Sequence, residues 1–238
     1  MKLRKFIATT IREYLNEQKE TLENVKLNDN FWKWFGNSKV VDNNGNPQIF
    51  YHGTDAYFNE FKIDPKLQKF GWTEGKGFYF SKIKPLAYGK NIIACYLKIE
   101  KPIYGLNYIF NKVELSKLGF YDNPLVKKET TEYGTYITIQ THPLLSPTID
   151  LNTDENTPIE NYKPVIKPIT YKGIIGMFAH LYPKFDIVDS IKNKLNYDGV
   201  IFNSINNSNV ICVVFYENNI KSIENDGTWD IADDNIFS

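Results

Sequence analysis

The sequence predicts an α+β fold in which antiparallel strands, joined mainly by hairpins, form most of the core. Three observations lead to this prediction. Residues 1–24 repeat apolar side chains with the spacing of an amphipathic helix. Short apolar or alternating runs are separated by turn-like segments rich in Asn, Gly and Pro. Aromatic residues make up 15% of the chain, and Tyr and Phe are favoured in sheets and in pockets for flat rings.

The N-terminal segment 1–28 is expected to be helical and amphipathic, with Lys, Arg and Glu opposite the apolar face. Two interpretations of this helix stay open: it packs on the main domain, or it docks to a partner. The residues at 28–30 look like a break and a new helix start, so Phe31–Phe35 is predicted to be a short aromatic helix or turn.

The remaining elements follow from local patterns. Strands are expected at residues 39–41, 48–52, 77–81, 91–99, 133–140, 199–202 and 210–215. A helix is predicted over Phe185–Leu195 from the spacing of its apolar residues. Residues 141–170, rich in Pro, Thr, Asn and Asp, are expected to form a long surface excursion. Because hairpins outnumber strand–helix–strand units, this order favours an α+β fold over a doubly wound sheet.

Composition limits the classes of function. The 238 residues suit one main domain, placed at 29–238, with the segment 1–28 as an appendage. Lys and Arg balance Asp and Glu at 28 each, so no bulk attraction to nucleic acid or anionic lipid is expected. No run approaches membrane-spanning length, and the apolar stretch 6–11 is too short for a signal peptide. A soluble, cytoplasmic protein is therefore expected, with no membrane and no nucleic-acid partner.

Cys95 and Cys212 lie in apolar, strand-like runs, and the prediction is that both are buried, reduced thiols. No Cys/His cluster has metal-ligand spacing, so no metal site is expected.

Three short segments contain candidate chemistry. Tyr51–Thr54 ends a predicted strand with His-Gly, where glycine lets the backbone approach a ligand closely and the histidine can hold a hydroxyl. Gly75–Ser81 places a lysine between two glycines before an aromatic strand whose tyrosine can stack on a flat heterocycle. The third segment is the strand 210–215 running into 217–222. Singly, each also fits an ordinary structural role: a turn-capping histidine, aromatic core and a buried strand.

Together, and in this order, the segments resemble the catalytic core of ADP-ribosyltransferases of the poly(ADP-ribose) polymerase and diphtheria-toxin type. The family motifs His-Gly-Ser/Thr and Gly-Lys-Gly-x-Tyr-Phe stand here as HGT at 52–54 and GKGFYF at 75–80. The closer resemblance is to ADP-ribosyltransferase domains of phage and mobile-element polyvalent proteins. It rests on WFGNSKVVDNNGNP at 34–47, YDGVIF at 197–202, ICVVFYENNIKS at 211–222 and DGTWD at 226–230. It covers residue 31 to the end, except a long insertion around 105–180.

The resemblance implies an ADP-ribosyltransferase fold, with a split antiparallel β-sheet core, flanking helices, and NAD bound as the substrate. It implies that His52 holds a ribose hydroxyl, that the Gly53 backbone binds the nicotinamide carboxamide, and that Tyr79 stacks on the nicotinamide ring. The residues expected to contact NAD are His52, Gly53, Thr54, Tyr79, Ser81 and Tyr88.

The second stacking tyrosine departs from the family pattern. The family places it about eleven residues after the first, where this chain has Lys90, and Tyr88 stands two positions earlier.

The resemblance implies a catalytic triad of His52, Tyr79 and a glutamate in the late strand. The glutamate is missing here: counting back from the Asn-x-Ile-Lys-Ser motif at the end of that segment, its position is occupied by Ile211. In the family, this glutamate holds a ribose hydroxyl and stabilises the cationic sugar formed as nicotinamide leaves. A preorganised negative charge there contributes a few kcal/mol. A His-Tyr-Ile arrangement also occurs among mono-ADP-ribosylating relatives, where a carboxylate on the target takes the place of the glutamate. Glu217 and Asp198 are the nearby carboxylates in sequence, and neither is expected to replace it.

The expected function is the transfer of one ADP-ribose from NAD to a side chain of a protein target, by a phage protein acting in a bacterial cytoplasm or carried in the virion. Chain extension is not expected without the glutamate. A catalytically inactive module that binds NAD or a virion partner stays open, as does an NAD hydrolase. A nuclease of polyvalent-protein type is a third class, against which the zero net charge and the missing His/Lys constellation count.

Overall fold

The computed structural model describes residues 27–63, 75–131, 134–150, 158–159, 162, 164, 167–181, 185–204 and 208–238. The helix expected within residues 1–28 lies almost entirely outside these residues. The chain divides into two compact units. The first comprises residues 1–63, 77–102 and 203–238, and the second comprises 64–76 and 103–202. The insertion expected around 105–180 falls within the second unit.

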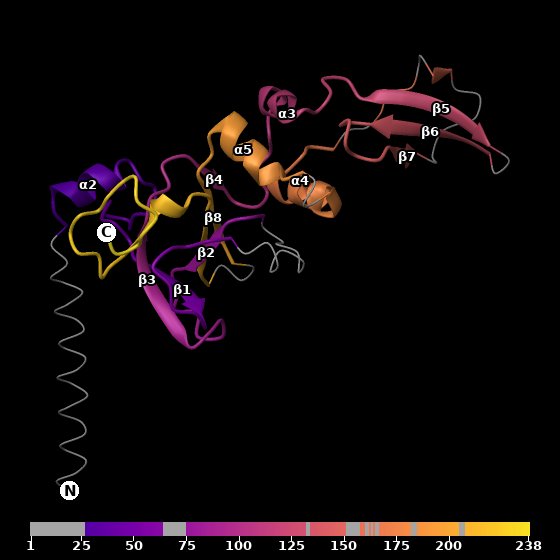
Figure 1. Cartoon of the computed structure of the whole chain (residues 1–238). Helices are drawn as coiled ribbons and strands as arrows, with labels where there is room; N and C mark the ends of the chain where they lie inside the picture. The colour runs from indigo at the N-terminus through magenta and orange to yellow at the C-terminus, as the bar shows by residue number, and fades with distance from the viewer. Residues whose placement is uncertain are drawn as a thin grey trace, which may run out of the picture. The chain divides into compact units, whose positions relative to one another are not determined.

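Antiparallel strands form the centre of the first unit, where they are neighbours in the order β10-β3-β1-β2-β9. Figure 1 labels β1, β2 and β3 of this group. Their bounds are β1 (Phe50–Thr54), β2 (Phe78–Ser81), β3 (Asn91–Leu97), β9 (Val210–Val214) and β10 (Ile220–Ser222). β1 pairs with β3 along its whole length, and β2 pairs in the same way with β9. Between β1 and β2, in contrast, the ladder contains the single pair Tyr51↔Ser81. The centre of this sheet is therefore held together by far fewer main-chain contacts than its two flanks.

The strand predicted at 39–41 is wrong. Only an isolated bridge forms there, between Val41 and Pro47. The Asp42 carboxylate accepts the N–H groups of Asn44 and Asn46, at 2.8 and 2.9 Å. A side chain that binds its own neighbouring backbone in this way competes with a sheet ladder and closes a turn instead.

The aromatic helix α2 (Asp29–Phe35) confirms the element predicted at 31–35 and begins two residues earlier. It begins there because the Asn28 side chain accepts the N–H of Phe31 at 2.9 Å, which caps the first turn. Its buried side chains pack with β3 and the C-terminal segment in one aromatic cluster. The cluster contains Phe31, Trp34, Phe35, Tyr96 and Trp229.

A buried lysine fixes the C-terminal segment. Lys221 on β10 is fully buried, and its Nζ donates to the carbonyl oxygens of Asp233 and Asn235 at 2.9 and 2.7 Å. Burial lowers the pKa of this ammonium group, and the carboxylates of Asp233 and Asp230 oppose that effect. The charge is stabilised by main-chain oxygens, so the tail that contains Trp229 is held against the sheet.

The second unit contains most of the helices and a small sheet in the order β5-β6-β7 (Figure 1). In chain order its elements are β4 (Pro102–Tyr104), α3 (Lys112–Leu118), β5 (Leu125–Thr131), β6 (Gly134–Gln140), β7 (Thr148–Asp150), α4 (Tyr171–Phe178), η3 (Ala179–Leu181), α5 (Ile187–Leu195) and β8 (Gly199–Asn203). Of these, β6, α5 and β8 confirm predicted elements to within two residues. The surface excursion expected at 141–170 contains β7, which pairs with β6.

Both cysteines are free and buried, as predicted. Burial also raises the pKa of each thiol, because it disfavours the thiolate. Within the part of the chain that the structure describes, no helix is both long and apolar enough to cross a membrane.

Replacing Lys221 with methionine tests how the tail is held. The variant Lys221→Met keeps the apolar stem but leaves two partly buried carbonyl oxygens without their donor, so the free energy of unfolding should fall by about 2–4 kcal/mol. Urea denaturation measures the change. The exposed lysine of α2 gives the control, because Lys33→Met should change stability by less than about 0.5 kcal/mol. Equal effects of the two substitutions would contradict the role assigned to Lys221.

Candidate active site

His52 lies beside the backbone of Tyr79. Its Nδ1 is 2.9 Å from the Tyr79 carbonyl oxygen. A carbonyl oxygen can only accept, so Nδ1 holds the proton and the neutral ring keeps Nε2 as an acceptor. Burial lowers the pKa of His52, and the bond to Tyr79 opposes that effect without reversing it. The site therefore favours a neutral imidazole of one defined tautomer.

Three phenylalanine rings surround the imidazole. Its centroid is 5.0 Å from that of Phe61, 5.5 Å from that of Phe80 and 6.4 Å from that of Phe58. Phe61 also contacts Phe78, at 5.4 Å between centroids. The His52 ring thus lies on the side of β2 that presents Phe78 and Phe80, in a low-dielectric environment that accounts for its lowered pKa.

The other side of β2 presents Tyr79 and Ser81, because side chains alternate along a strand. The register pairs Tyr79 with Val213 and Ser81 with Ile211, and directly paired residues point to the same face. Tyr79 and Ile211 therefore share one face of the sheet. The imidazole of His52 and the ring of Tyr79 lie on opposite sides of β2, and the histidine reaches Tyr79 through its main chain.

The segment after β2 covers the glycine of the His-Gly-Thr motif. A methyl group placed on Gly53 would lie 3.0 Å from the carbonyl oxygens of both Pro85 and Tyr88. Gly89 has φ +135° and lies so close to the backbone of Thr54 that no side chain fits. The sequence predicted that Gly53 allows a close approach of a ligand, and in the structure the close approach is made by this segment.

Tyr88 is brought near the motif by this packing. A methyl group on Gly53 would lie 3.1 Å from the Cβ of Tyr88, and Tyr88 as a whole residue is 76% exposed. The structure therefore places a solvent-facing aromatic residue next to Gly53. The Thr54 hydroxyl oxygen accepts the N–H of Ala56 at 3.1 Å.

The hydroxyl of Ser81 is fully used within the protein. It donates to the carbonyl oxygen of Ile83 at 2.5 Å, and it accepts from the Ile83 N–H at 3.2 Å and the Asn209 Nδ2 at 2.7 Å. One donor and two acceptors exhaust a serine hydroxyl. Ser81 is only 7% exposed, so its hydroxyl has no capacity left for a ligand in this arrangement.

Ile211 is half-buried at the start of β9, opposite Ser81. Glu217 lies in η4 (Glu217–Asn219), beyond the other end of β9. Ile211 and Glu217 are therefore separated by the rest of the strand. Asp198 precedes β8 in the second unit. Within the described residues, no group of three or more His, Cys, Asp and Glu side chains could hold a metal ion.

Sequence reasoning missed Asn209 and Phe61. Asn209 follows the turn-like segment that precedes β9, where one more asparagine is not distinctive. Phe61 comes nine residues after His52 in the sequence, and its ring contacts the His52 imidazole only in the folded chain. Neither side chain belongs to a motif, so only the contacts show that they support the strands of the candidate site.

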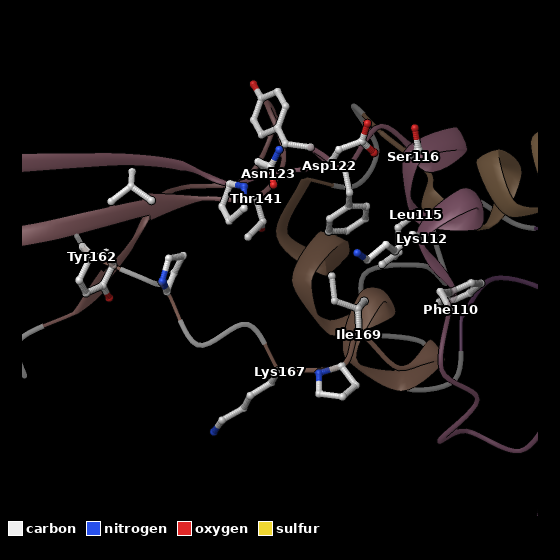
Figure 2. A pocket seen from close by; sticks show the side chains of 16 residues that line it. Phe110, Lys112, Leu115, Ser116, Asp122, Asn123, Thr141, Tyr162, Lys167 and Ile169 are labelled. Atoms are coloured by element: carbon white, nitrogen blue, oxygen red, sulfur yellow. The ribbon is translucent and has the colours of Figure 1, made fainter. Parts of the chain in front are cut away.

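The second unit contains a separate cavity of about 650 Å³ (Figure 2). Aromatic and proline side chains form much of its lining, including Phe110, Phe120, Tyr121, Tyr162, Pro124 and Pro168. Lys112, Asp122 and Lys167 add charges of both signs. None of the residues expected to contact NAD lines this cavity.

Comparison with known families agrees with the motifs on the first unit. The family model described as ADP-ribosyltransferase in polyvalent proteins matches residues 42–229, which include β1, β2 and β9. A search of curated proteins and a search of solved structures each find no match. Because the matched range covers most of the chain, this protein belongs to the ADP-ribosyltransferase family of polyvalent proteins.

Proposed function

We propose that the chain transfers a single ADP-ribose from NAD to a side chain of a protein target, as a phage protein acting in the cytoplasm of its bacterial host or carried in the virion. The main support is the interrupted ladder between β1 and β2. After Tyr51↔Ser81 the ladder stops, and the imidazole of His52 binds the Tyr79 carbonyl in place of a strand amide. We place the nicotinamide end of NAD where the two strands stop pairing, which makes this sheet the split sheet of the family.

Each side chain then has a defined task. The Nε2 of His52 accepts a hydrogen bond from a ribose hydroxyl, because Nδ1 already donates to Tyr79. The ring of Tyr79 stacks on nicotinamide from the face it shares with Ile211. The Gly53 backbone binds the carboxamide, and the exposed ring of Tyr88 covers the nicotinamide from the segment that lies on Gly53.

The reaction breaks the bond between nicotinamide and the ribose C1 carbon, and nicotinamide leaves as a neutral base. The acceptor atom of the target forms a new bond to C1; an N–H or O–H acceptor passes its proton to water, and a carboxylate acceptor has none to release. Ile211 gives no negative charge to stabilise the cationic sugar. The proposal is therefore that a carboxylate of the target supplies this charge, which limits the reaction to one transfer because a growing chain of ADP-ribose has no such group.

The second candidate is an inactive module that binds NAD or a virion partner without cleaving NAD. The isoleucine at position 211 favours it, because the face that contains Tyr79 has no carboxylate on the paired residues of β2 and β9. Incubation with NAD labelled in its adenylate part separates the candidates. Label on a protein supports the transferase, nicotinamide release without labelled protein supports an NAD hydrolase, and intact NAD supports the inactive module.

Substitutions at His52 test the NAD site. His52→Ala should weaken NAD binding about tenfold, because it removes the hydrogen bond to ribose and the donor to Tyr79. His52→Asn keeps an N–H donor for the Tyr79 carbonyl and lacks an acceptor in place of Nε2. His52→Asn should therefore fold normally, and its NAD affinity should be lowered as in His52→Ala. Calorimetric titration with NAD gives both affinities, and unchanged affinity in both variants would refute the site.

A glutamate at position 211 tests the chemistry. Ile211→Glu restores a negative charge on the Tyr79 face and should raise nicotinamide release at least about tenfold. Val210→Glu is the matched control, because a one-residue step along β9 points the carboxylate to the opposite face. Release of nicotinamide from NAD measures both variants. An equal response of the two variants would show that the register around Ile211 does not form the site.

Acidification should destabilise the fold through its histidines. The folded-state pKa of His52, and also of His142, is below the ordinary value of 6.5 because burial disfavours the charged ring. The unfolded chain therefore binds more protons as the pH falls below 6.5, and stability is lost in that direction. Thermal melting between pH 7.5 and 5.5 should show this loss, and His52→Gln should show less of it. An identical pH dependence in this variant would contradict the buried, neutral His52.

A further inference from the structure

Asn209 links the two strands of the candidate site to the segment that follows β2. It lies two residues before Ile211, and its Nδ2 donates to the Ser81 hydroxyl at 2.7 Å. Its Oδ1 accepts the main-chain N–H of Ile83 at 3.2 Å. One side chain thus contacts the last residue of β2 and the backbone two residues beyond it.

Ser81 completes this arrangement. Its hydroxyl accepts the same Ile83 N–H at 3.2 Å and donates to the Ile83 carbonyl oxygen at 2.5 Å. Both main-chain groups of Ile83 are therefore held by the two side chains. The N–H of Lys82 adds a main-chain bond to the Val210 carbonyl at 2.9 Å. The first residues after β2 are fixed to the start of β9.

The far end of the same segment is fixed by different contacts. Gly89 lies against the backbone of Thr54, and the N–H of Lys90 donates to the Asp55 carboxylate at 3.0 Å. Between these two anchors, the carbonyl oxygens of Pro85 and Tyr88 cover Gly53. The position of Tyr88 therefore depends on both ends, and Asn209 holds the end next to Ile211.

We propose that Asn209 is a positioning residue for NAD binding, which it supports by holding the segment Lys82–Gly89 over Gly53 and thereby placing the ring of Tyr88. This inference rests on the proposed function, since Tyr88 matters here only as a wall of the NAD site. Asn209 acts through Ile83 and need not touch NAD. Ser81 has the same task, which accounts for a buried hydroxyl that is saturated by protein partners.

The experiment combines two measurements on the full chain. Hydrogen exchange of the Ile83 amide, measured in the presence and in the absence of NAD, reports whether Asn209 and Ser81 still hold the backbone of Ile83. Calorimetric titration with NAD reports whether the anchor matters for binding. Asn209→Ala removes both contacts of the side chain. Asn209→Asp keeps an oxygen acceptor for the Ile83 N–H and loses the donor to Ser81. Ser208→Ala, at the exposed neighbouring residue, is the matched control.

In Asn209→Ala, the Ile83 amide should exchange about tenfold faster and NAD affinity should fall about tenfold, as expected when one to two net hydrogen bonds are lost. Asn209→Asp should be affected less in both measurements, and Ser208→Ala should match the wild type. Ser81→Ala should weaken NAD binding to a similar degree. The double variant Ser81→Ala/Asn209→Ala should be affected more than either single one, because each single variant leaves the other side chain bonded to Ile83.

The outcomes separate this inference from the proposed function. Faster exchange with unchanged NAD affinity would show a merely structural anchor and overturn the positioning role, while the NAD site stands. Unchanged exchange in Asn209→Ala would overturn it as well. A wild-type chain that binds no NAD would refute the proposed function, and the positioning role with it. Faster exchange together with weaker NAD binding, in a variant that keeps its melting temperature, supports the inference.

Discussion

The hydrogen bond between the His52 imidazole and the Tyr79 carbonyl oxygen is the contact on which the site depends. β1 and β2 pair at Tyr51↔Ser81 and then stop, so the Tyr79 carbonyl needs another donor. The imidazole supplies it, which fixes the tautomer of the ring and presents its second nitrogen as an acceptor. The same bond thus satisfies the backbone where the ladder is interrupted and leaves the second ring nitrogen of His52 as an acceptor.

The two faces of β2 present different side chains around that contact. On one face, Phe58, Phe61 and Phe80 enclose the imidazole and lower its pKa, so the ring stays neutral. On the other face, Tyr79 pairs with Val213 and Ser81 pairs with Ile211, so Tyr79 and Ile211 share this face at diagonal positions. An isoleucine at this position brings no charge to the face that presents Tyr79. Under the proposed function, a carboxylate of the target supplies that charge.

Local signals predicted some elements well and failed for others. The α2 helix and the strands β2, β3, β8 and β9 were predictable, because capping residues and apolar runs are read within a few positions. α3 begins with a capping box formed by Asn111 and Glu114, which is a local signal of the same kind. β5 is polar along most of its length and is a strand only because β6 pairs with it. No local pattern reveals a strand whose stability comes from its partner.

The sequence by itself determined the family and the order of the motifs, because both are a matter of residue type and spacing. Tertiary structure alone decided how the motif residues meet. It put the rings of His52 and Tyr79 on opposite sides of β2, saturated the Ser81 hydroxyl, and moved Asn209 into contact with Ile83. These features depend on strand register and on hydrogen-bond partners that lie far apart along the chain, and spacing within a motif contains no information about either.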